Sequence, residues 1–307
     1  MITAAVGFAG AVVVAFAAPP TLRILLHRMD PRQVLLTWAA LLSACLVLLM
    51  APLFVSLLPR HGGVTVLMSW ATRCLPSAQH TVSGRLVAMI GLVGVAVALT
   101  TALRFALRWR VLSRQRSAAL DKHRSLSRIL HGTADLPVLW LPSPAPFAYS
   151  LAGRPAMIVA GRGLTARLDP AAVGAVLAHE RAHVHHRHHL LVTIAEAVAY
   201  ALPWLPIARH SPELVRTLVE LDADGHAAEL FGATAVRRAL TRLGDAPTPE
   251  CALAIADDRI ELRLARLAER RAGHRIRPRR AAAAALAAPA LSMLLLAATF
   301  VLTSCGK

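Results

Sequence analysis

The sequence predicts a mostly α-helical integral membrane protein, with four transmembrane helices and an α+β domain that contains a small β-hairpin or sheet. Apolar residues make up 56% of the 307 residues and charged residues 17%, whereas a globular domain has about 25% charged residues. The apolar residues also gather in four charge-free runs of 18 to 25 residues, and about 20 such residues cross a bilayer core. The runs are Ile2–Leu22, Val34–Leu58, Leu86–Leu103 and Ala281–Ser304.

The net charge of +17 is concentrated beside these runs. Basic residues follow the first run, trail the third run up to Arg128 and precede the last run from Arg270. Arginine and lysine beside spans mark the cytoplasmic side and suit anionic headgroups of the lipid bilayer. We therefore expect a multi-pass protein of the cell membrane, with both termini outside and residues 104–280 on the cytoplasmic side. No recognition motif accompanies the charge, so direct binding of nucleic acid is not expected.

The runs divide the chain into three segments. Residues 1–108 form a three-span membrane module, residues 109–280 a domain on the cytoplasmic side, and residues 281–307 a last transmembrane helix with a short tail. No basic residue precedes the first run, so we interpret it as an uncleaved span. Two cysteines, Cys74 and Cys305, both fall on the outer side, where a disulfide between them and two free thiols are both open.

Within the middle segment, the pattern predicts a basic amphipathic helix over 109–135 and then short strands. Residues 137–141 form an apolar strand, and residues 148–150 and 156–160 flank a turn that predicts a hairpin. Ala156–Ala160 is either an edge strand that a substrate extends or an ordinary core strand. Residues 190–207 are apolar but carry Glu196, and a charge at the bilayer centre is costly. We expect a helix that dips into the membrane boundary, with a full span as the alternative.

Two further helices carry the residues that could bind a metal or act as acids and bases. Asp169 and Pro170 are typical of an N-cap and a first helical residue, so a helix should begin there. Another should begin at Ser211-Pro212 and end before Gly232, and residues 250–280 also have a helical pattern.

His179 and His183 lie four residues apart on the first of these helices, so both side chains project from one face. Two imidazoles so placed can bind one tetrahedral zinc ion. Glu180, beside the first histidine, can accept a proton from a water molecule that the metal activates and pass it to a leaving amine. This is the H-E-x-x-H arrangement of metallopeptidases. The alternative is a solvated face of a His-rich helix.

A catalytic zinc ion needs a third protein ligand, and Glu220 on the helix from Ser211 is the candidate. Asp224 shares its face at i, i+4 and can accept a hydrogen bond from the far nitrogen of a ligating histidine. The alternative is a solvated acidic face. Arg187 and His226 are candidates to stabilise an oxyanion or contact substrate, although a structural role is the stronger expectation for each. His185, His186, His188 and His189 are expected near lipid headgroups, with a place facing the site as the alternative for His186.

These motifs resemble the BlaR/MecR-type membrane metallopeptidases. The resemblance rests on His179-Glu180-Arg181-Ala182-His183, then Arg187–Leu191, then Pro203-Trp204-Leu205-Pro206, and then Glu220-x-x-x-Asp224. It is strongest over residues 137–230, and the layout of three spans before the site and one after extends it. The resemblance implies a gluzincin-type, zincin-like domain with one zinc ion per chain, His179, His183 and Glu220 as ligands, and Glu180 as general base.

The same resemblance implies regulated cleavage of a cytosolic protein substrate, connected in antibiotic-sensing members with a transcriptional repressor. Those members carry an outer penicillin-binding domain that this sequence does not contain, so direct β-lactam sensing is not expected. A homodimer is left open. One alternative is a quality-control or processing peptidase like HtpX or the CAAX prenyl proteases, which share the motif. Another is a catalytically silent membrane scaffold for signalling, against which the intact Glu180 argues.

Overall fold

A computed structural model gives the arrangement of five stretches of the chain. The described residues are 2–57, 84–127, 138–153, 156–243 and 257–271. The predicted last span, Ala281–Ser304, and the cysteines Cys74 and Cys305 lie outside them. Among the described residues, three helices are long and apolar enough to cross a membrane. These candidate spans are Phe8–Arg28, Pro31–Met50 and Leu92–Ala118.

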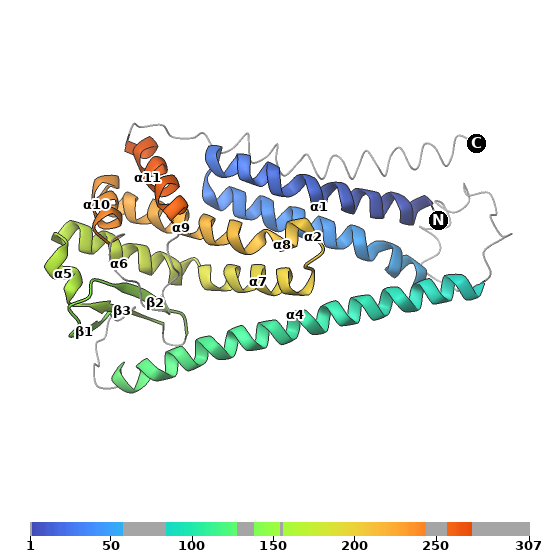
Figure 1. Ribbon diagram of the computed structural model, residues 1–307, viewed down its shortest axis with the longest axis horizontal. Helices are drawn as coiled ribbons and strands as arrows, with labels where there is room; N and C mark the ends of the chain where they lie inside the picture. Colours follow the sequence, from blue (N-terminus) through green and yellow to red (C-terminus); the bar gives the residue numbers. More distant parts are fainter. Residues whose placement is uncertain (1, 58–83, 128–137, 154–155, 244–256, 272–307) are drawn as a thin grey trace.

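The first two of these helices form an antiparallel hairpin, and the third runs along the opposite side of the molecule (Figure 1). They are α1 (Ile2–Arg28), α2 (Pro31–Leu57) and α4 (Gly84–Ser127). α4 continues without a break beyond the third apolar run. The basic helix predicted from residue 109 is therefore the second half of α4 rather than a separate element.

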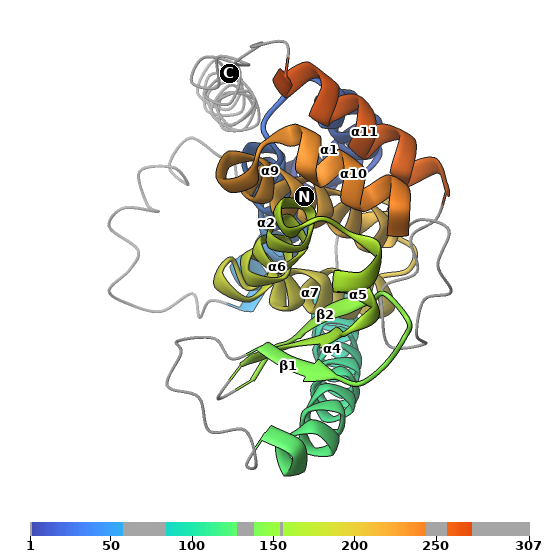
Figure 2. The ribbon, with the colours of Figure 1, turned by 90° about the vertical axis from the view of Figure 1, so that its left-hand side faces the viewer.

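A three-stranded sheet lies beside one end of α4 (Figure 2). Its strands are β1 (Val138–Leu141), β2 (Ala148–Leu151) and β3 (Met157–Gly161). β3 is central, with β1 parallel on one side and β2 antiparallel on the other. The predicted hairpin is confirmed. Of the two alternatives for Ala156–Ala160, the core strand is confirmed and the edge strand is wrong. β3 is an uninterrupted, fully buried apolar run, which is typical of a central strand, and the edge that contacts the helices belongs to β2.

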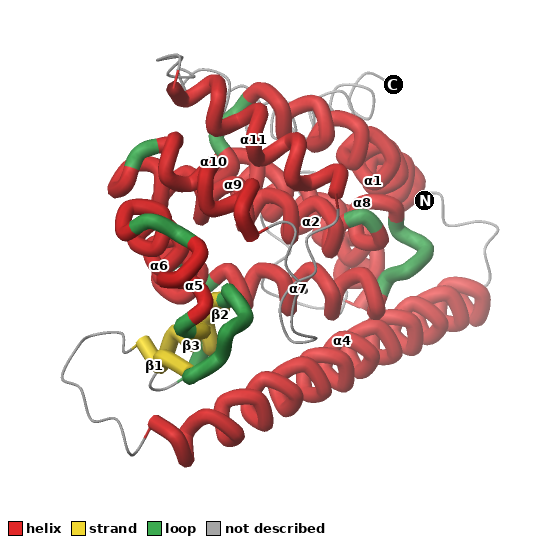
Figure 3. The backbone as a smooth tube through the Cα atoms, turned by 60° about the vertical axis from the view of Figure 1, so that its left-hand side comes forward, coloured by secondary structure: helices red, strands yellow, loops and turns green. Residues whose placement is uncertain are grey.

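The other regular elements of the described chain are helices, joined by short loops (Figure 3). They are α5 (Gly163–Arg167), α6 (Pro170–His185), α7 (His188–Ala201), α8 (Pro206–Arg209), α9 (Ser211–Phe231), α10 (Ala233–Leu243) and α11 (Asp257–Arg271). α6 begins as predicted, because the Asp169 carboxylate accepts a hydrogen bond from the Ala172 backbone N–H at 3.0 Å. α9 likewise begins at Ser211 and stops at Gly232, whose φ of 83° suits glycine.

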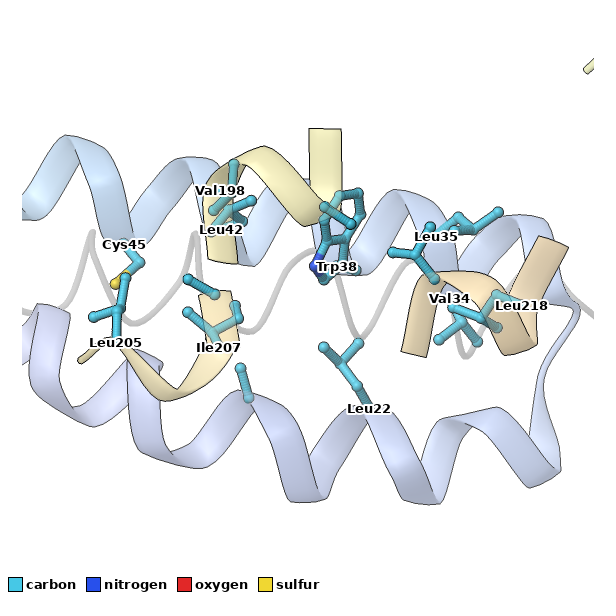
Figure 4. Packing of buried hydrophobic residues seen from close by; sticks show 14 of the residues in the cluster. Leu22, Val34, Leu35, Trp38, Leu42, Cys45, Val198, Leu205, Ile207 and Leu218 are labelled. Atoms are coloured by element: carbon cyan, nitrogen blue, oxygen red, sulfur yellow. The ribbon is translucent and has the colours of Figure 1, made fainter. Parts of the chain in front are cut away.

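The largest core joins the α1–α2 hairpin to α7, α8 and α9 (Figure 4). Trp38 of α2 is 2% exposed, and its indole N–H donates to Ser211 Oγ at 2.7 Å. The Ser211 hydroxyl in turn donates to the Ile207 carbonyl oxygen at 2.7 Å. α9 is therefore fixed directly on the apolar hairpin. The domain boundary at residue 108 stays a prediction, since this core includes residues from both sides of it.

Residues 190–207 contain a helix, a turn and the start of a second helix. α7 ends at Ala201, and α8 begins at Pro206. The carboxylate of Glu196 pairs with Arg216 of α9 and lies 4.0 Å from Arg108 of α4. These arginines compensate the charge of Glu196 within a mostly apolar helix. Its depth in a membrane stays a prediction.

Candidate metal centre

Helices α6 and α9 bring three metal-binding side chains together. His179 and His183 lie one turn apart on α6, with their Nε2 atoms 3.0 Å apart. The carboxylate oxygens of Glu220 on α9 lie 3.3 Å from His179 Nε2 and 3.4 Å from His183 Nε2. All three side chains are at most 17% exposed. We call His179, His183 and Glu220 the ligand cluster.

The hydrogen-bond partners of this cluster favour tautomers in which its inward-facing nitrogens can bind a metal. His179 Nδ1 lies 2.9 Å from Asp224 Oδ1, so its N–H donates to that carboxylate and Nε2 keeps a lone pair. His183 Nδ1 lies 3.0 Å from Nδ1 of His188, and an N–H there again leaves a lone pair on Nε2. Both lone pairs face the oxygens of Glu220. A cation satisfies such a set of acceptors.

The donor set fits zinc. Zinc–nitrogen and zinc–oxygen distances of about 2.0–2.2 Å place two ligands of a tetrahedral ion about 3.3–3.4 Å apart. The three separations in the ligand cluster are 3.0, 3.3 and 3.4 Å. Two imidazoles and one carboxylate form the ligand set of a catalytic zinc site, which keeps its fourth position for water. The structure thus brings together His179, His183 and Glu220, the three ligands predicted from the sequence.

Arg263 of α11 is a site residue that the sequence analysis missed. It is 4% exposed, and its Nε and Nη2 donate to the two oxygens of Asp224 at 2.6 and 2.7 Å. Its Nη1 lies 3.2 Å from Glu220 Oε2. One guanidinium therefore holds Glu220 and Asp224 in place. In the sequence, Arg263 looks like any other basic residue of a charged helix.

The pKa values of His179 and His183 are shifted in opposite directions by their surroundings. Burial lowers the pKa of His183 to about 3, with the nearby charges of His179, His188 and Arg263 acting in the same direction. Burial also lowers the pKa of His179, but its hydrogen bonds to Asp224 and Glu220 outweigh this and raise it to about 10. The pKa of Glu220 is held well below its usual range, because His183 and Arg263 outweigh its burial. Without a metal, His179 is therefore protonated, and its positive charge is shared between the carboxylates of Asp224 and Glu220.

Glu180 turns toward the sheet. Burial raises the pKa of its carboxyl to about 7, although the charge of His179 and hydrogen bonds from the hydroxyl and backbone N–H of Ser150 act against it. A general base works best when its pKa lies near the operating pH. Ser150 belongs to β2, so this carboxylate lies between the ligand cluster and the edge strand.

The remaining predicted residues lie outside the ligand cluster. Arg187 is exposed at the turn between α6 and α7, where its φ is 54°. His226 packs edge-on against the ring of His186, with ring centroids 5.4 Å apart. These positions add no support for a role of Arg187 or His226 at an oxyanion. That role stays a prediction. The expectation that His188 lies among headgroups is wrong, because His188 is 2% exposed and contacts His183.

A second group of similar composition adjoins the first. His186, His188 and Asp222 have metal-binding atoms within 4.8 Å of one another, as the ligand cluster does. Asp222 Oδ2 lies 2.7 Å from His186 Nδ1 and 3.1 Å from His188 Nε2. Its other oxygen, Oδ1, accepts from the Nε–H of Arg32 at 2.7 Å. We call His186, His188 and Asp222 the flanking cluster.

Comparison with known protein families gives one match. Residues 135–211 match peptidase family M48, a family of zinc metallopeptidases. The matched segment contains the sheet, His179, Glu180 and His183, and ends before α9 supplies Glu220. It supports a metallopeptidase domain, that is, a peptide hydrolase. Searches of curated proteins and of solved structures find no match.

Proposed function

We propose that this protein is a zinc-dependent endopeptidase of the cell membrane, which cleaves a cytosolic or membrane-proximal protein in regulated signalling of the BlaR/MecR type. The observation that carries the proposal is the convergence of the metal-binding atoms of His179, His183 and Glu220, within 4.8 Å of one another, beside Glu180. The family match over the same helix supports it. The basic residues that flank the apolar runs favour the cytoplasmic side.

The residues of the chain divide the reaction between them. His179, His183 and Glu220 would hold the metal, and Asp224 with Arg263 would keep the first of these in its ligating tautomer. When bound, zinc supplies a Lewis acid that polarises the substrate carbonyl and acidifies water. Glu180 takes a proton from the attacking water molecule and returns it to the leaving amine as the peptide C–N bond breaks.

The substrate would lie along β2. This strand forms the edge of the sheet next to α6, and an extended peptide can pair with such an edge through backbone hydrogen bonds. Ser150 of this strand hydrogen-bonds Glu180, so a peptide on this edge would lie beside that carboxylate. This arrangement would place the scissile carbonyl between Glu180 and the metal.

The test compares purified full-length protein with Glu180→Gln. A matched control is Glu213→Gln, which makes the same charge change at an exposed position of α9. We expect zinc in all three proteins, and cleavage of a casein or self-derived peptide by the unchanged protein and Glu213→Gln. Equal cleavage by Glu180→Gln would contradict the mechanism and leave a scaffold role.

The substrate is sought by comparing the proteomes of cells that express either form. A repressor that accumulates uncleaved with Glu180→Gln supports the signalling role. Accumulation of many damaged membrane proteins instead supports the quality-control role of HtpX-like peptidases and would overturn the signalling proposal.

A further inference from the structure

The flanking cluster connects the ligand cluster to the turn between α1 and α2. The connection begins at His183, whose Nδ1 lies 3.0 Å from His188 Nδ1. It continues from His188 Nε2 to Asp222 Oδ2 at 3.1 Å and from Asp222 Oδ1 to Arg32 Nε at 2.7 Å. His188 and Asp222 are buried. The path therefore runs through the protein interior from a proposed metal ligand to an apolar helix.

The direction of the protons along this path follows from the metal site. If His183 offers Nε2 to a metal, its Nδ1 carries the hydrogen and donates to His188 Nδ1. His188 must then carry its own hydrogen on Nε2, which donates to Asp222. Asp222 thus sets the tautomer of His188, which in turn sets the tautomer of His183. An anionic and correctly placed Asp222 is required at the end of the path.

Arg32 supplies that placement. Its Nε–H donates to Asp222, and its Nη2 donates to His186 Nε2 at 3.0 Å, while His186 Nδ1 lies 2.7 Å from Asp222 Oδ2. Each ring nitrogen and each carboxylate oxygen of the flanking cluster therefore has a hydrogen-bond partner. This pairing, and the guanidinium charge, leave no set of acceptors that would need a second metal ion.

The turn that carries Arg32 is itself fixed. The Asp30 carboxylate accepts from the Arg32 backbone N–H at 2.9 Å, which is the bond of a helix N-cap. Arg266 of α11 donates to the carbonyl oxygens of His27 and Met29 at the end of α1. α11 also carries Arg263, so one helix contacts both the α1–α2 turn and the acidic residues of the metal centre.

We infer that Arg32 is a positioning residue of the metal centre: through Asp222 and His188, it holds His183 in the orientation that binds zinc. The inference rests on the proposed function, because it assumes a zinc ion on the ligand cluster. It makes the position of the α1–α2 turn relative to α9 a determinant of metal affinity. The Arg32 side chain is 56% exposed, so replacing it should loosen the path without opening the core.

The test measures the zinc dissociation constant by competition with a chelator, together with kcat and KM, for the purified full-length protein. Variants are Arg32→Gln, Arg32→Lys and Asp222→Asn. The control is Arg28→Gln, which removes one charge from an exposed residue at the end of α1. We expect Arg32→Gln to weaken zinc binding about tenfold, the lower end of the effect of residues that support metal ligands, and to lower kcat with little change in KM.

Two further comparisons separate positioning from a general structural role. Arg32→Lys should recover only part of the affinity, because an ammonium group cannot reproduce the two directed contacts of the guanidinium. Adding Arg32→Gln to Asp222→Asn should cause no further loss, since both act along one path. Arg28→Gln should stay within about twofold of the unchanged protein, as surface substitutions do.

The outcomes distinguish this inference from the proposed function. If the unchanged protein binds no zinc, the proposed function fails. If it binds one zinc ion but Arg32→Gln or Asp222→Asn binds zinc as tightly as Arg28→Gln, only the inference is overturned. Losses that multiply in the double variant would also overturn it. Should Arg32→Gln fail to fold, the affinity of Asp222→Asn decides.

Discussion

The ligand cluster and the flanking cluster each contain two histidines and one carboxylate from the same two regions of the chain. Both bring their metal-binding atoms within 4.8 Å of one another. They differ in their hydrogen-bond partners. Nε2 of both His179 and His183 faces the oxygens of Glu220, and Asp224 holds the other nitrogen of His179. In the flanking cluster, Asp222 is contacted by Arg32 as well as by the two histidines, so a guanidinium already supplies the positive charge. Composition and distance alone would make both of them metal sites. The hydrogen-bond partners behind each histidine predict that only the first binds zinc.

The largest contrast should appear between two acidic residues of α9 that lie two positions apart. Glu220→Gln removes a metal ligand, so we expect loss of stoichiometric zinc and of cleavage. Asp222→Asn should keep one zinc ion per chain, with an affinity about 10–100-fold weaker. Metal analysis of both purified variants, before and after dialysis against a chelator, makes the comparison. Retention of tightly bound zinc by Glu220→Gln would place the metal elsewhere.

Glu180→Gln should separate catalysis from metal binding. The amide cannot accept the proton of the attacking water, so kcat should fall by about 10²–10⁴-fold, the usual contribution of a general base. Zinc content should stay at one per chain, because Glu180 is not in the ligand cluster. Steady-state kinetics and metal analysis on the same sample check both halves. A loss of zinc together with activity would instead make Glu180 part of the metal site.

Arg263→Gln tests how much the buried guanidinium stabilises the acidic residues of the metal centre. It leaves Asp224 and Glu220 without their buried partner, and breaking such a pair costs about 3–5 kcal/mol. Thermal unfolding in detergent should show a large decrease in midpoint temperature. Glu269→Gln on the same helix disrupts only an exposed pair with Arg266 at 3.5 Å, worth about 0–1 kcal/mol. Equal midpoints for the two variants would exclude Arg263 as a support of the site.

The smallest effect should come from the flanking cluster itself. His186→Ala removes one of its histidines, which is partly exposed and hydrogen-bonds to Asp222 and Arg32. We expect one zinc ion per chain and cleavage within about threefold of the unchanged protein, because His188 still links Asp222 to His183. Titration with zinc followed by gel filtration checks the stoichiometry. A fall from two zinc ions to one would identify the flanking cluster as a second metal site.

Local patterns were sufficient to predict the ligand cluster. His179 and His183 share a helical face by spacing alone, and the caps at Asp169 and Ser211 fix where α6 and α9 begin. Glu220 and Asp224 share a face by the same rule. Asp222 lies about 200° around the helix from Glu220, since each residue turns by about 100°. It therefore had to have a different partner, which the sequence did not identify.

The supporting residues depend on packing between distant segments, which residue spacing does not encode. Arg32 and Arg263 resemble ordinary basic residues of a helix, and only the placement of α2 and α11 against α9 brings them to acidic partners. His188 follows Arg187, whose left-handed backbone redirects the chain between α6 and α7. Helical spacing from His183 therefore fails there. The uninterrupted apolar run of β3 was the signal for a central strand, and its position beside a hairpin turn obscured it.

Anomalous X-ray diffraction at the zinc absorption edge, on crystals of the purified full-length protein, tests the central claim most directly. The account predicts one anomalous peak, about 2.0–2.2 Å from His179 Nε2, His183 Nε2 and a Glu220 oxygen. A peak between His186, His188 and Asp222 with none at Glu220, or the absence of any peak from zinc-supplemented protein, would contradict it.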